Sequence, residues 1–229
     1  MKKIKIAALG DSLTKGVVLN ERNRYAVLDK GFVDIVRDEL DMEVENYGKF
    51  GCTVRYGHAV LDRHPEVIAQ SDYTFLEYGG NDCDFEWEKI GDDPEADYQP
   101  KTMLESFKES FADLVRRVKE AGSRPLIISL PPIDSENYFG FLTRNMDDRQ
   151  RSNVLKWLGG DVNIIGKWHE SYNRALFQVA AATDTQIIDV TRSFDEIGPD
   201  SRKVFCSDGI HPNSEGHKLI ASSIVNLFL

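Results

Sequence analysis

The residue types needed for acyl transfer through a serine lie near the two ends of the chain. Ser12 stands in Gly-Asp-Ser-Leu-Thr-Lys-Gly at 10–16, directly after an apolar run. Asp208 and His211 stand three residues apart in Asp-Gly-Ile-His-Pro, within reach of each other across one turn. A serine hydroxyl becomes nucleophilic when a neutral imidazole accepts its proton, and a carboxylate on the second ring nitrogen fixes the tautomer. These residues predict a catalytic triad of Ser12, His211 and Asp208.

Two further segments supply hydrogen-bond donors for the negative charge that develops on the carbonyl oxygen. Gly51 ends Asn-Tyr-Gly-Lys-Phe-Gly at 46–51, and Asn81 lies in Gly-Gly-Asn-Asp at 79–82. A glycine permits close backbone approach, and a side-chain amide donates without carrying charge. The N–H groups at the start of a helix also lack internal partners. We therefore predict an oxyanion hole formed by the Ser12 and Gly51 N–H groups and the Asn81 side chain.

The segment around Ser12, taken alone, has a more common explanation. Either Asp11 or Ser12 can act as a helix N-cap by accepting hydrogen bonds from the first N–H groups of a following helix. A phosphate-binding loop is excluded, because it needs Gly-x4-Gly-Lys-Ser/Thr. Here five residues separate Gly10 from Gly16, and Lys15 precedes the second glycine. The nucleophile interpretation therefore depends on the other segments.

The elements that must position these residues alternate along the chain. Apolar runs predict strands at 4–9, 42–46, 73–78, 125–130 and 186–190. Helical patterns are found at 32–40, 54–70, 103–118, 168–182 and 214–228. Five alternations of strand and helix predict a parallel sheet with helices on both faces. Ligands bind such sheets at the carboxyl ends of the strands, which is where the segments with Ser12, Gly51 and Asn81 begin.

Taken together and in order, these segments resemble the SGNH (GDSL-type) superfamily of esterases, lipases and acylhydrolases. Its serine block corresponds to 10–13, its oxyanion glycine block to 46–51, its Gly-x-Asn-Asp block to 79–82 and its Asp-x-x-His block to 208–211. The resemblance implies an α/β fold, a flavodoxin-like three-layer α/β/α sandwich around a five-stranded parallel sheet. It implies no metal and no organic cofactor. One departure is Cys52, where many relatives carry Asp or a small residue.

Length and charge restrict the range of partners. A chain of 229 residues with 41% hydrophobic residues fits a single domain at 1–229. The net charge of −10 opposes binding to nucleic acid or anionic membranes and favours a small-molecule substrate. The apolar run after the basic start is too short for a secretory signal, and no run is long enough to span a membrane. These features predict a cytoplasmic protein, with its oligomeric state left open.

One long segment, 131–167, interrupts the alternation of strand and helix. Long segments of this kind are often functional lids, so we predict either a lid or a plain insertion within the domain. Several aromatic residues in and next to it either wall an acyl or sugar pocket or belong to the core: Tyr138, Phe139, Phe141, Trp157 and Trp168.

Histidines and cysteines outside the triad have ordinary explanations. His58 and His64 are six residues apart and do not share a helix face as metal ligands would, so no metal site is predicted. Cys52, Cys83 and Cys206 form no Cys-x-x-Cys pair, which favours free thiols. Each stands within two residues of a predicted site residue, so the three either line the site or are small buried hydrophobes.

The sequence therefore predicts a serine esterase that hydrolyses a carboxylic ester through an acyl-enzyme on Ser12. We expect a short, acetyl-type acyl group on a sugar or small alcohol, since no apolar helix suggests docking on lipid. An acyltransferase with the same triad is an alternative, because water and alcohol acceptors differ only in the shape of the pocket. A silent module that binds an ester or glycan is a further alternative, disfavoured because every catalytic position is filled.

Overall fold

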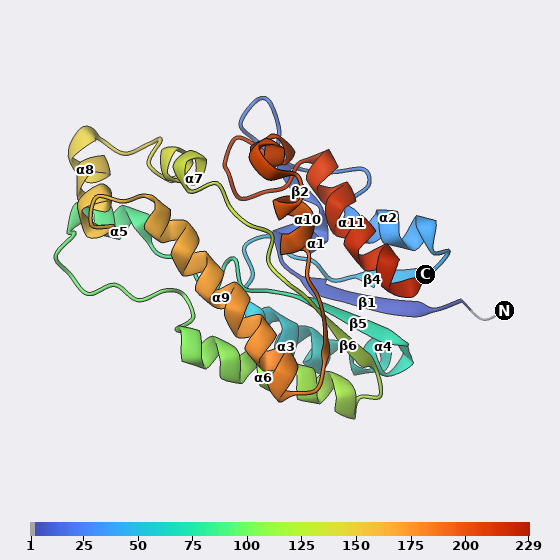
Figure 1. The fold of residues 1–229 in the computed structure, drawn as a ribbon. Coiled ribbons are helices and arrows are strands. Elements are labelled where there is room, and N and C mark those ends of the chain that lie inside the picture. Colours follow the sequence, from blue (N-terminus) through green and yellow to red (C-terminus); the bar gives the residue numbers. More distant parts are fainter. Residues whose placement is uncertain (1–2) are drawn as a thin grey trace.

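A five-stranded parallel sheet forms the centre of the computed structural model (Figure 1). The structure describes residues 3–229, without the side chains of 199 and 200, so the first two residues of the basic start lie outside the described part. In order of pairing, the strands are β4 (Glu43–Asn46), β1 (Lys5–Gly10), β5 (Tyr73–Glu77), β6 (Arg124–Ile128) and β7 (Gln186–Ile188). All five lie at the predicted positions.

The order of the strands creates a crevice at one edge of the sheet. The chain goes from β1 to β4 on one side and then crosses back to place β5 on the other side of β1. At such a switch point the loops leave in opposite directions, and ligands bind outside the carboxyl ends of the strands. Gly10 pairs with Glu77, so β1 and β5 end side by side. The segments that carry Ser12 and Asn81 therefore begin on either side of this crevice.

Both faces of the sheet are buried, as the alternation of side chains along β1 shows. Ala7 and Leu9 pack into one apolar cluster, whereas Ile6 and Ala8 pack into another on the opposite face. Because successive side chains of a strand point to opposite faces, a continuous apolar strand needs helices on both sides. The predicted three-layer α/β/α fold is confirmed.

Helices on the two faces come from different parts of the chain (Figure 1). One face is covered by α2 (Phe32–Glu39), α10 (Thr191–Asp195) and α11 (Ser214–Phe228), with the 3-10 helix η1 (Gly198–Val204) beside them. The other face is covered by α3 (Val54–Arg63), α4 (Pro65–Gln70), α6 (Leu104–Glu120) and α9 (Asn163–Ala182). The single helix predicted over 54–70 is therefore wrong. It is two helices because Pro65, which lacks an N–H, occupies the first position of α4.

The chain after Ser12 also differs from the expected helix. It forms a single turn, α1 (Ser12–Lys15), which ends at Gly16 with a φ of 80°. An antiparallel hairpin follows, made of β2 (Val17–Leu19) and β3 (Tyr25–Val27). This hairpin was not predicted from the sequence, because strands of three residues are too short to show an alternating pattern. The hairpin places Tyr25 next to the predicted site.

Residues 131–167 fold into helices of their own. They contain α7 (Ser135–Leu142), α8 (Asp148–Trp157) and the beginning of α9. Together with α5 (Trp87–Asp92) they surround a third apolar cluster at one end of the molecule (Figure 1). Its buried members are Phe85, Ile90, Phe139, Val154, Leu158 and Ile165. Movement of this segment as a lid stays a prediction.

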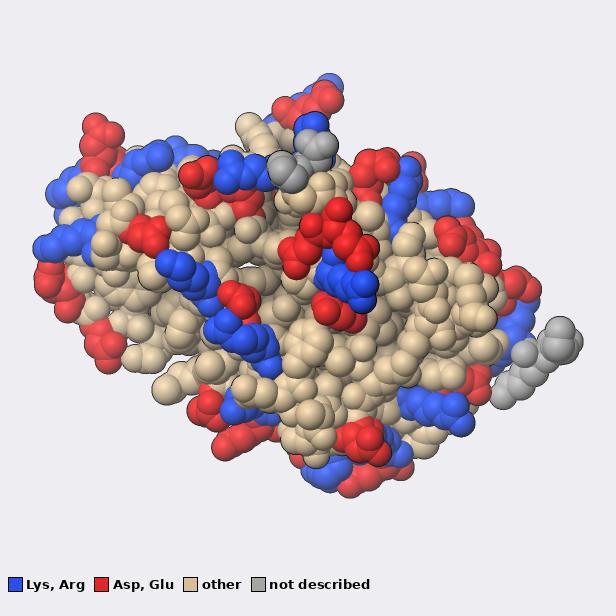
Figure 2. All heavy atoms as spheres, in the orientation of Figure 1, with Lys and Arg blue, Asp and Glu red and all other residues tan. Residues whose placement is uncertain are grey.

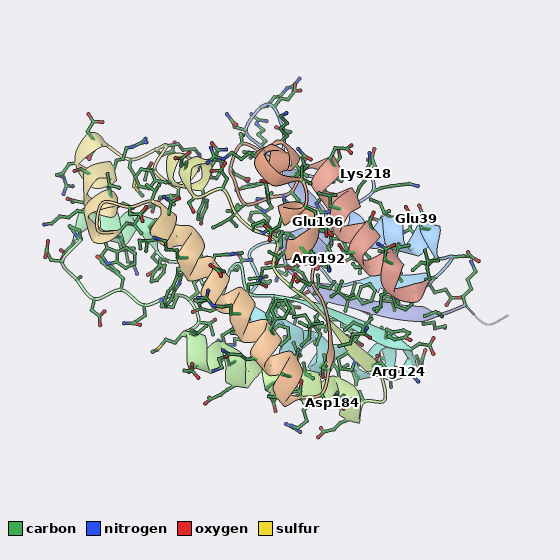
Figure 3. The ribbon with its side chains drawn as sticks, viewed as in Figure 1. Glu39, Arg124, Asp184, Arg192, Glu196 and Lys218 are labelled. Carbon is green, nitrogen blue, oxygen red and sulfur yellow. The ribbon has the colours of Figure 1, made fainter. Side chains whose placement is uncertain are left out.

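Charges of both signs are interspersed on the face shown in Figure 2. An example is Arg192 on α10 with Glu196 directly after this helix, both labelled in Figure 3, whose Nε and Oε1 atoms lie 2.8 Å apart. Both side chains are well exposed, so the pair adds little to stability. Within residues 3–229, no helix is both long and apolar enough to cross a bilayer.

Candidate active site

Ser12, His211 and Asp208 form a continuous chain of hydrogen bonds at the carboxyl end of the sheet. The Ser12 Oγ atom lies 3.0 Å from His211 Nε2, although the two residues are 199 positions apart. His211 Nδ1 lies 2.7 Å from Asp208 Oδ2. All three side chains are buried. With the Nδ1 proton donated to the carboxylate, Nε2 is free to accept the proton of the serine.

The turn that carries Asp208 and His211 is closed by its own backbone. Asp208 Oδ1 accepts hydrogen bonds from the N–H groups of Ile210 and His211, at 3.2 and 3.1 Å. Burial raises the pKa of Asp208, but the side-chain hydrogen bond from His211, the attraction of its protonated ring and these two backbone hydrogen bonds outweigh burial and hold the pKa below its usual value. Asp208 therefore stays ionised at neutral pH, ready to stabilise an imidazolium ion.

Gly209 connects this turn to the segment 131–167. Its backbone has a φ of 75°, a left-handed conformation that favours glycine. A Cβ atom at this position would lie 2.5 Å from the carbonyl oxygen of Asp134. The Asp134 N–H donates to the Gly209 carbonyl at 2.8 Å, immediately before α7 begins. The inserted segment thus helps to hold the turn of Asp208 and His211 in place.

Ser12 occupies the first position of α1, directly after the helix N-cap. The cap is Asp11, whose Oδ1 accepts a hydrogen bond from the Leu13 N–H at 2.9 Å. The cap explanation therefore applies to Asp11, and the Ser12 hydroxyl remains available to His211. Within the described part of the chain, no acceptor pairs with the Ser12 N–H. A short helix thus presents both a hydroxyl and a free N–H to the crevice.

The loop with Gly51 is tied to α1 by the side chain of Asn46. Asn46 Nδ2 donates to the Thr14 carbonyl at 2.8 Å, and Asn46 Oδ1 accepts from the Gly48 N–H at 2.8 Å. Gly51 has a φ of 72°, which is again left-handed. The departure at Cys52 leaves the loop closed, since the Cys52 N–H donates to the Lys49 carbonyl at 3.4 Å.

Asn81 reaches the same crevice from the end of β5. Its Nδ2 atom donates one hydrogen to Asp11 Oδ2 at 2.8 Å, which orients the amide. The second hydrogen of this amide has no partner among the described residues. Ser12, Gly51, Asn81 and His211 line one cavity. The structure therefore brings together all five residues that the sequence singled out for catalysis.

The carboxyl groups of Asp11 and Glu77 form a buried pair next to these residues. The pair was not predicted from the sequence. Glu77 Oε2 accepts hydrogen bonds from Thr14 Oγ1 at 2.8 Å and from the Asp11 N–H at 3.4 Å. Burial, followed by the negative charge of Asp11, raises the pKa of Glu77 well above its usual value. The raised pKa favours the neutral form of Glu77. The signal in the sequence was a carboxylate near the end of an otherwise apolar strand.

Replacing this carboxyl group with an amide is expected to change how stability depends on pH. A carboxyl whose pKa is raised in the fold contributes stability at low pH that is lost as the pH rises through the folded-state pKa. Glu77→Gln removes this loss, so the Tm of the variant relative to the wild type should rise by a few degrees as the pH increases above about 5, where an unfolded glutamate is ionised. Thermal unfolding followed by circular dichroism measures the difference. The exposed Glu39→Gln is the control, and a Tm difference for Glu77→Gln that does not grow with pH contradicts the assignment.

Comparison with known proteins identifies the family of this chain. Residues 8–219 match the model of the GDSL-like lipase/acylhydrolase family. The chain belongs to this family. The predicted resemblance to SGNH (GDSL-type) hydrolases is thereby confirmed, and with it an enzyme class that hydrolyses esters.

Solved structures with the GDSL-like fold superpose over nearly the whole chain. A lipase/acylhydrolase from Enterococcus faecalis has a TM-score of 0.66 at 20% identity, covering 98% of this chain and 95% of that chain. An acetylxylan esterase from Geobacillus stearothermophilus has a TM-score of 0.61 at 21% identity, covering 97% and 93%. At these identities the likeness shows the fold alone.

A sequence relative also comes from Bacillus subtilis (strain 168), where it is described as an uncharacterized lipoprotein. It is 24% identical over 198 residues, which cover 83% of this chain and 72% of that protein. The cytoplasmic location predicted for the present chain stays a prediction.

Two aromatic rings flank the histidine of this GDSL-like site and were not singled out by the sequence analysis. The Tyr25 ring packs edge-on against the His211 ring with centroids 5.2 Å apart, and the Phe50 ring stacks on it at 6.1 Å. Tyr25 is 41% exposed and Phe50 is 47% exposed. The side of His211 that these rings cover is therefore the open side of the site.

The three cysteines are free thiols in different surroundings, and Cys52 is partly buried. Cys83 lines the cavity and donates its Sγ hydrogen to the Gly80 carbonyl at 3.2 Å, and burial raises its pKa well above the usual value. Cys206 accepts the Leu19 N–H at 3.4 Å and lies in the core. Of the three, Cys83 is the one found among the described lining residues.

Proposed function

We propose that this chain is a serine carboxylic ester hydrolase with Ser12 as its nucleophile. The observation that carries the proposal is the buried hydrogen-bond chain from Asp208 through His211 to Ser12. Ser12 Oγ attacks the ester carbonyl while His211 Nε2 accepts its proton. The same nitrogen then donates this proton to the leaving alcohol, and water repeats the sequence to release the acid.

Three donors are proposed to stabilise the negative charge of the tetrahedral intermediate: the N–H groups of Ser12 and Gly51 and the side-chain amide of Asn81. The first is free at the start of α1, and the third is held in place by Asp11. Such preorganised donors act on charge that is absent from the ground state, so they lower the barrier without tightening substrate binding.

Replacing Asn81 with Ala is expected to lower kcat about 10²- to 10³-fold with little change in KM, because the lost hydrogen bond matters in the transition state. Steady-state kinetics on p-nitrophenyl acetate separates the two constants. The exposed Asn226→Ala on α11 is the control. A rise in KM at constant kcat would place Asn81 in ground-state binding instead.

Labelling with a fluorophosphonate tests the assignment of the nucleophile. These reagents phosphonylate an activated serine, so mass spectrometry should find one adduct, on the peptide that contains Ser12. Ser12→Ala should abolish the adduct, whereas the exposed Ser152→Ala should leave it in place. An unlabelled wild type, or an adduct on another serine, would overturn the proposal.

The acceptor of the acyl group distinguishes the proposal from its main alternative. A hydrolase passes the acyl group to water, whereas an acyltransferase passes it to an alcohol. In the presence of excess alcohol or sugar, a transferase yields mainly the new ester and a hydrolase mainly the free acid. The acetyl-type acyl group on a sugar or small alcohol stays a prediction, and the cavity beside Ser12 has room for a larger group.

A further inference from the structure

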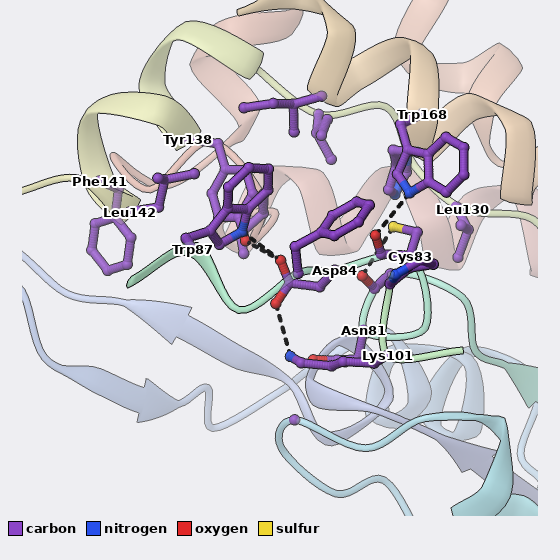
Figure 4. Close-up of a pocket in the computed structure, with 18 of the residues that line it drawn as sticks. Asn81, Cys83, Asp84, Trp87, Lys101, Leu130, Tyr138, Phe141, Leu142 and Trp168 are labelled. Atoms are coloured by element: carbon purple, nitrogen blue, oxygen red, sulfur yellow. Dashed lines mark hydrogen bonds and ion pairs between the residues drawn. The ribbon is translucent and has the colours of Figure 1, made fainter. Parts of the chain in front are cut away.

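The cavity that begins at Ser12 and His211 extends well beyond them. Its volume is about 560 Å³, within the range of about 300 to 1,000 Å³ found for pockets that bury a drug-sized ligand. It continues past Asn81 to a wall formed by the third apolar cluster and α9 (Figure 4). That wall includes Phe85, Trp157, Leu158, Ile165 and Trp168. An acetyl group would fill only the part next to Ser12.

Two polar side chains of the aromatic wall are paired with the carboxylate of Asp84. Asp84 Oδ1 accepts hydrogen bonds from Trp87 Nε1 at 2.8 Å and from the Tyr138 hydroxyl at 2.9 Å (Figure 4). Asp84 Oδ2 forms an ion pair with Lys101 Nζ at 2.8 Å. Asp84 therefore joins α5, α7 and the segment before α6 into one wall. Trp87 and Tyr138 line the cavity with their rings, and their donors bond to Asp84.

The deep end of the cavity is uncharged. Trp168 Nε1 donates to the Cys83 carbonyl at 2.9 Å, so this indole also has no donor left. His169 lines the same end, and burial lowers its pKa to about 4, which keeps the imidazole neutral. Among the described residues it has no hydrogen-bond partner. A sugar would need partners for several hydroxyl groups here, and unmade hydrogen bonds of buried hydroxyls are costly. A hydrocarbon group needs no such partners, and the one described group at this end that it would leave unpaired is the neutral imidazole of His169.

The position of His211 indicates which half of the ester enters this cavity. The leaving alcohol receives its proton from His211 Nε2, so it must lie on the side of this imidazole. That side is covered by Tyr25 and Phe50, which are both exposed. The acyl group then lies on the opposite side, toward Asn81 and Cys83, which lead into the deep end.

We propose that the cavity between the sheet and the segment of α5, α7, α8 and α9 binds the acyl group of the substrate, a medium-length hydrocarbon chain of about octanoyl size. The alcohol leaves on the solvent side, past Tyr25 and Phe50. This inference rests on the proposed serine esterase function, and it replaces the acetyl-type group expected from the sequence with a larger acyl group.

A series of p-nitrophenyl esters tests the proposal with a constant leaving group. From acetate through butyrate to octanoate, kcat/KM should rise at least tenfold, because each added methylene is buried against the apolar wall. A value for acetate equal to or above that for octanoate overturns the proposal and leaves the esterase assignment intact.

A variant that fills the cavity tests where the chain lies. Leu142, at the end of α7, lines the cavity and is only partly buried, so Leu142→Trp adds bulk there (Figure 4). The ratio of kcat/KM for octanoate to that for acetate should fall at least fivefold. The matched control is Met103→Trp, an exposed position outside the cavity, which should keep the ratio of the wild type. An unchanged ratio in a folded Leu142→Trp variant contradicts the proposed location.

Binding to an inactive variant separates the failure of this proposal from the failure of the esterase assignment. Titration calorimetry of Ser12→Ala with octanoate should show binding with a negative heat-capacity change, the mark of buried apolar surface, and acetate should show none. Absence of octanoate binding overturns the acyl pocket whatever the activity. If Ser12→Ala binds octanoate but the wild type hydrolyses no ester, the acyl pocket is supported and the esterase assignment is contradicted.

Discussion

Ser12→Ala is expected to lower kcat for p-nitrophenyl ester hydrolysis by about 10⁴- to 10⁶-fold, with the fold intact. In the structure its hydroxyl has one catalytic partner, His211 Nε2 at 3.0 Å, and no second hydroxyl shares that nitrogen among the described residues. Removing the nucleophile of a triad typically leaves only the catalysis supplied by the oxyanion hole and by binding. Initial rates at saturating substrate measure the loss.

Two controls make this result specific. Far-ultraviolet circular dichroism and the Tm of Ser12→Ala should match those of the wild type, because Asp11 and not Ser12 caps α1. Ser152→Ala, at an exposed position on α8, should keep full activity. Turnover by Ser12→Ala within tenfold of the wild type would show that Ser12 is not the nucleophile.

Asp208→Asn is expected to lower kcat by about 10⁴-fold. Its carboxylate accepts the Nδ1 hydrogen of His211 at 2.7 Å and so keeps Nε2 free as an acceptor. An asparagine amide placed there donates to Nδ1 and selects the opposite tautomer, in which Nε2 carries the hydrogen and cannot take the serine proton. Rates at neutral pH test this effect.

The matched control for this second substitution is Asp195→Asn, an exposed carboxylate at the end of α10. Its activity should equal that of the wild type. If Asp208 acts through His211 and Ser12, Asp208→Asn should cause no additional loss in a chain that already carries Ser12→Ala. A loss of less than tenfold for Asp208→Asn alone would mean that another group orients the imidazole.

Much of the fold could be predicted because the main strands are apolar on both faces. A strand buried on both sides appears as a short continuous apolar run, and β1, β5 and β6 have this pattern. The hairpin of β2 and β3 lacks such a run, and so Tyr25 was not connected with the site. The break between α3 and α4 was missed although Pro65 signals it, because the apolar spacing continues on both sides.

Most of the candidate site could be predicted for a related reason. Ser12, Gly51 and Asn81 follow strands of a parallel sheet, so the topology places them at one edge without any knowledge of the packing. Asp208 and His211 are neighbours within one turn, which the spacing alone implies. The buried groups that surround these site residues could not be predicted. The buried pair of Asp11 and Glu77 depends on the register of β1 against β5, which a single sequence does not display.

The sequence by itself determined the order of the strands along the chain, the chemistry at their ends and the family, because these depend on residue types at fixed spacing. Only the tertiary structure decided how the site is supported and how large its cavity is. Asp11 meets Asn81 across 70 positions, and Trp168 meets Cys83 across 85. The first contact depends on the pairing of β1 with β5, and the second on how α9 packs through shape and buried area, neither of which follows a local spacing. For the same reason the sequence carried no measure of the cavity, and the larger acyl group is a proposal that starts from the structure.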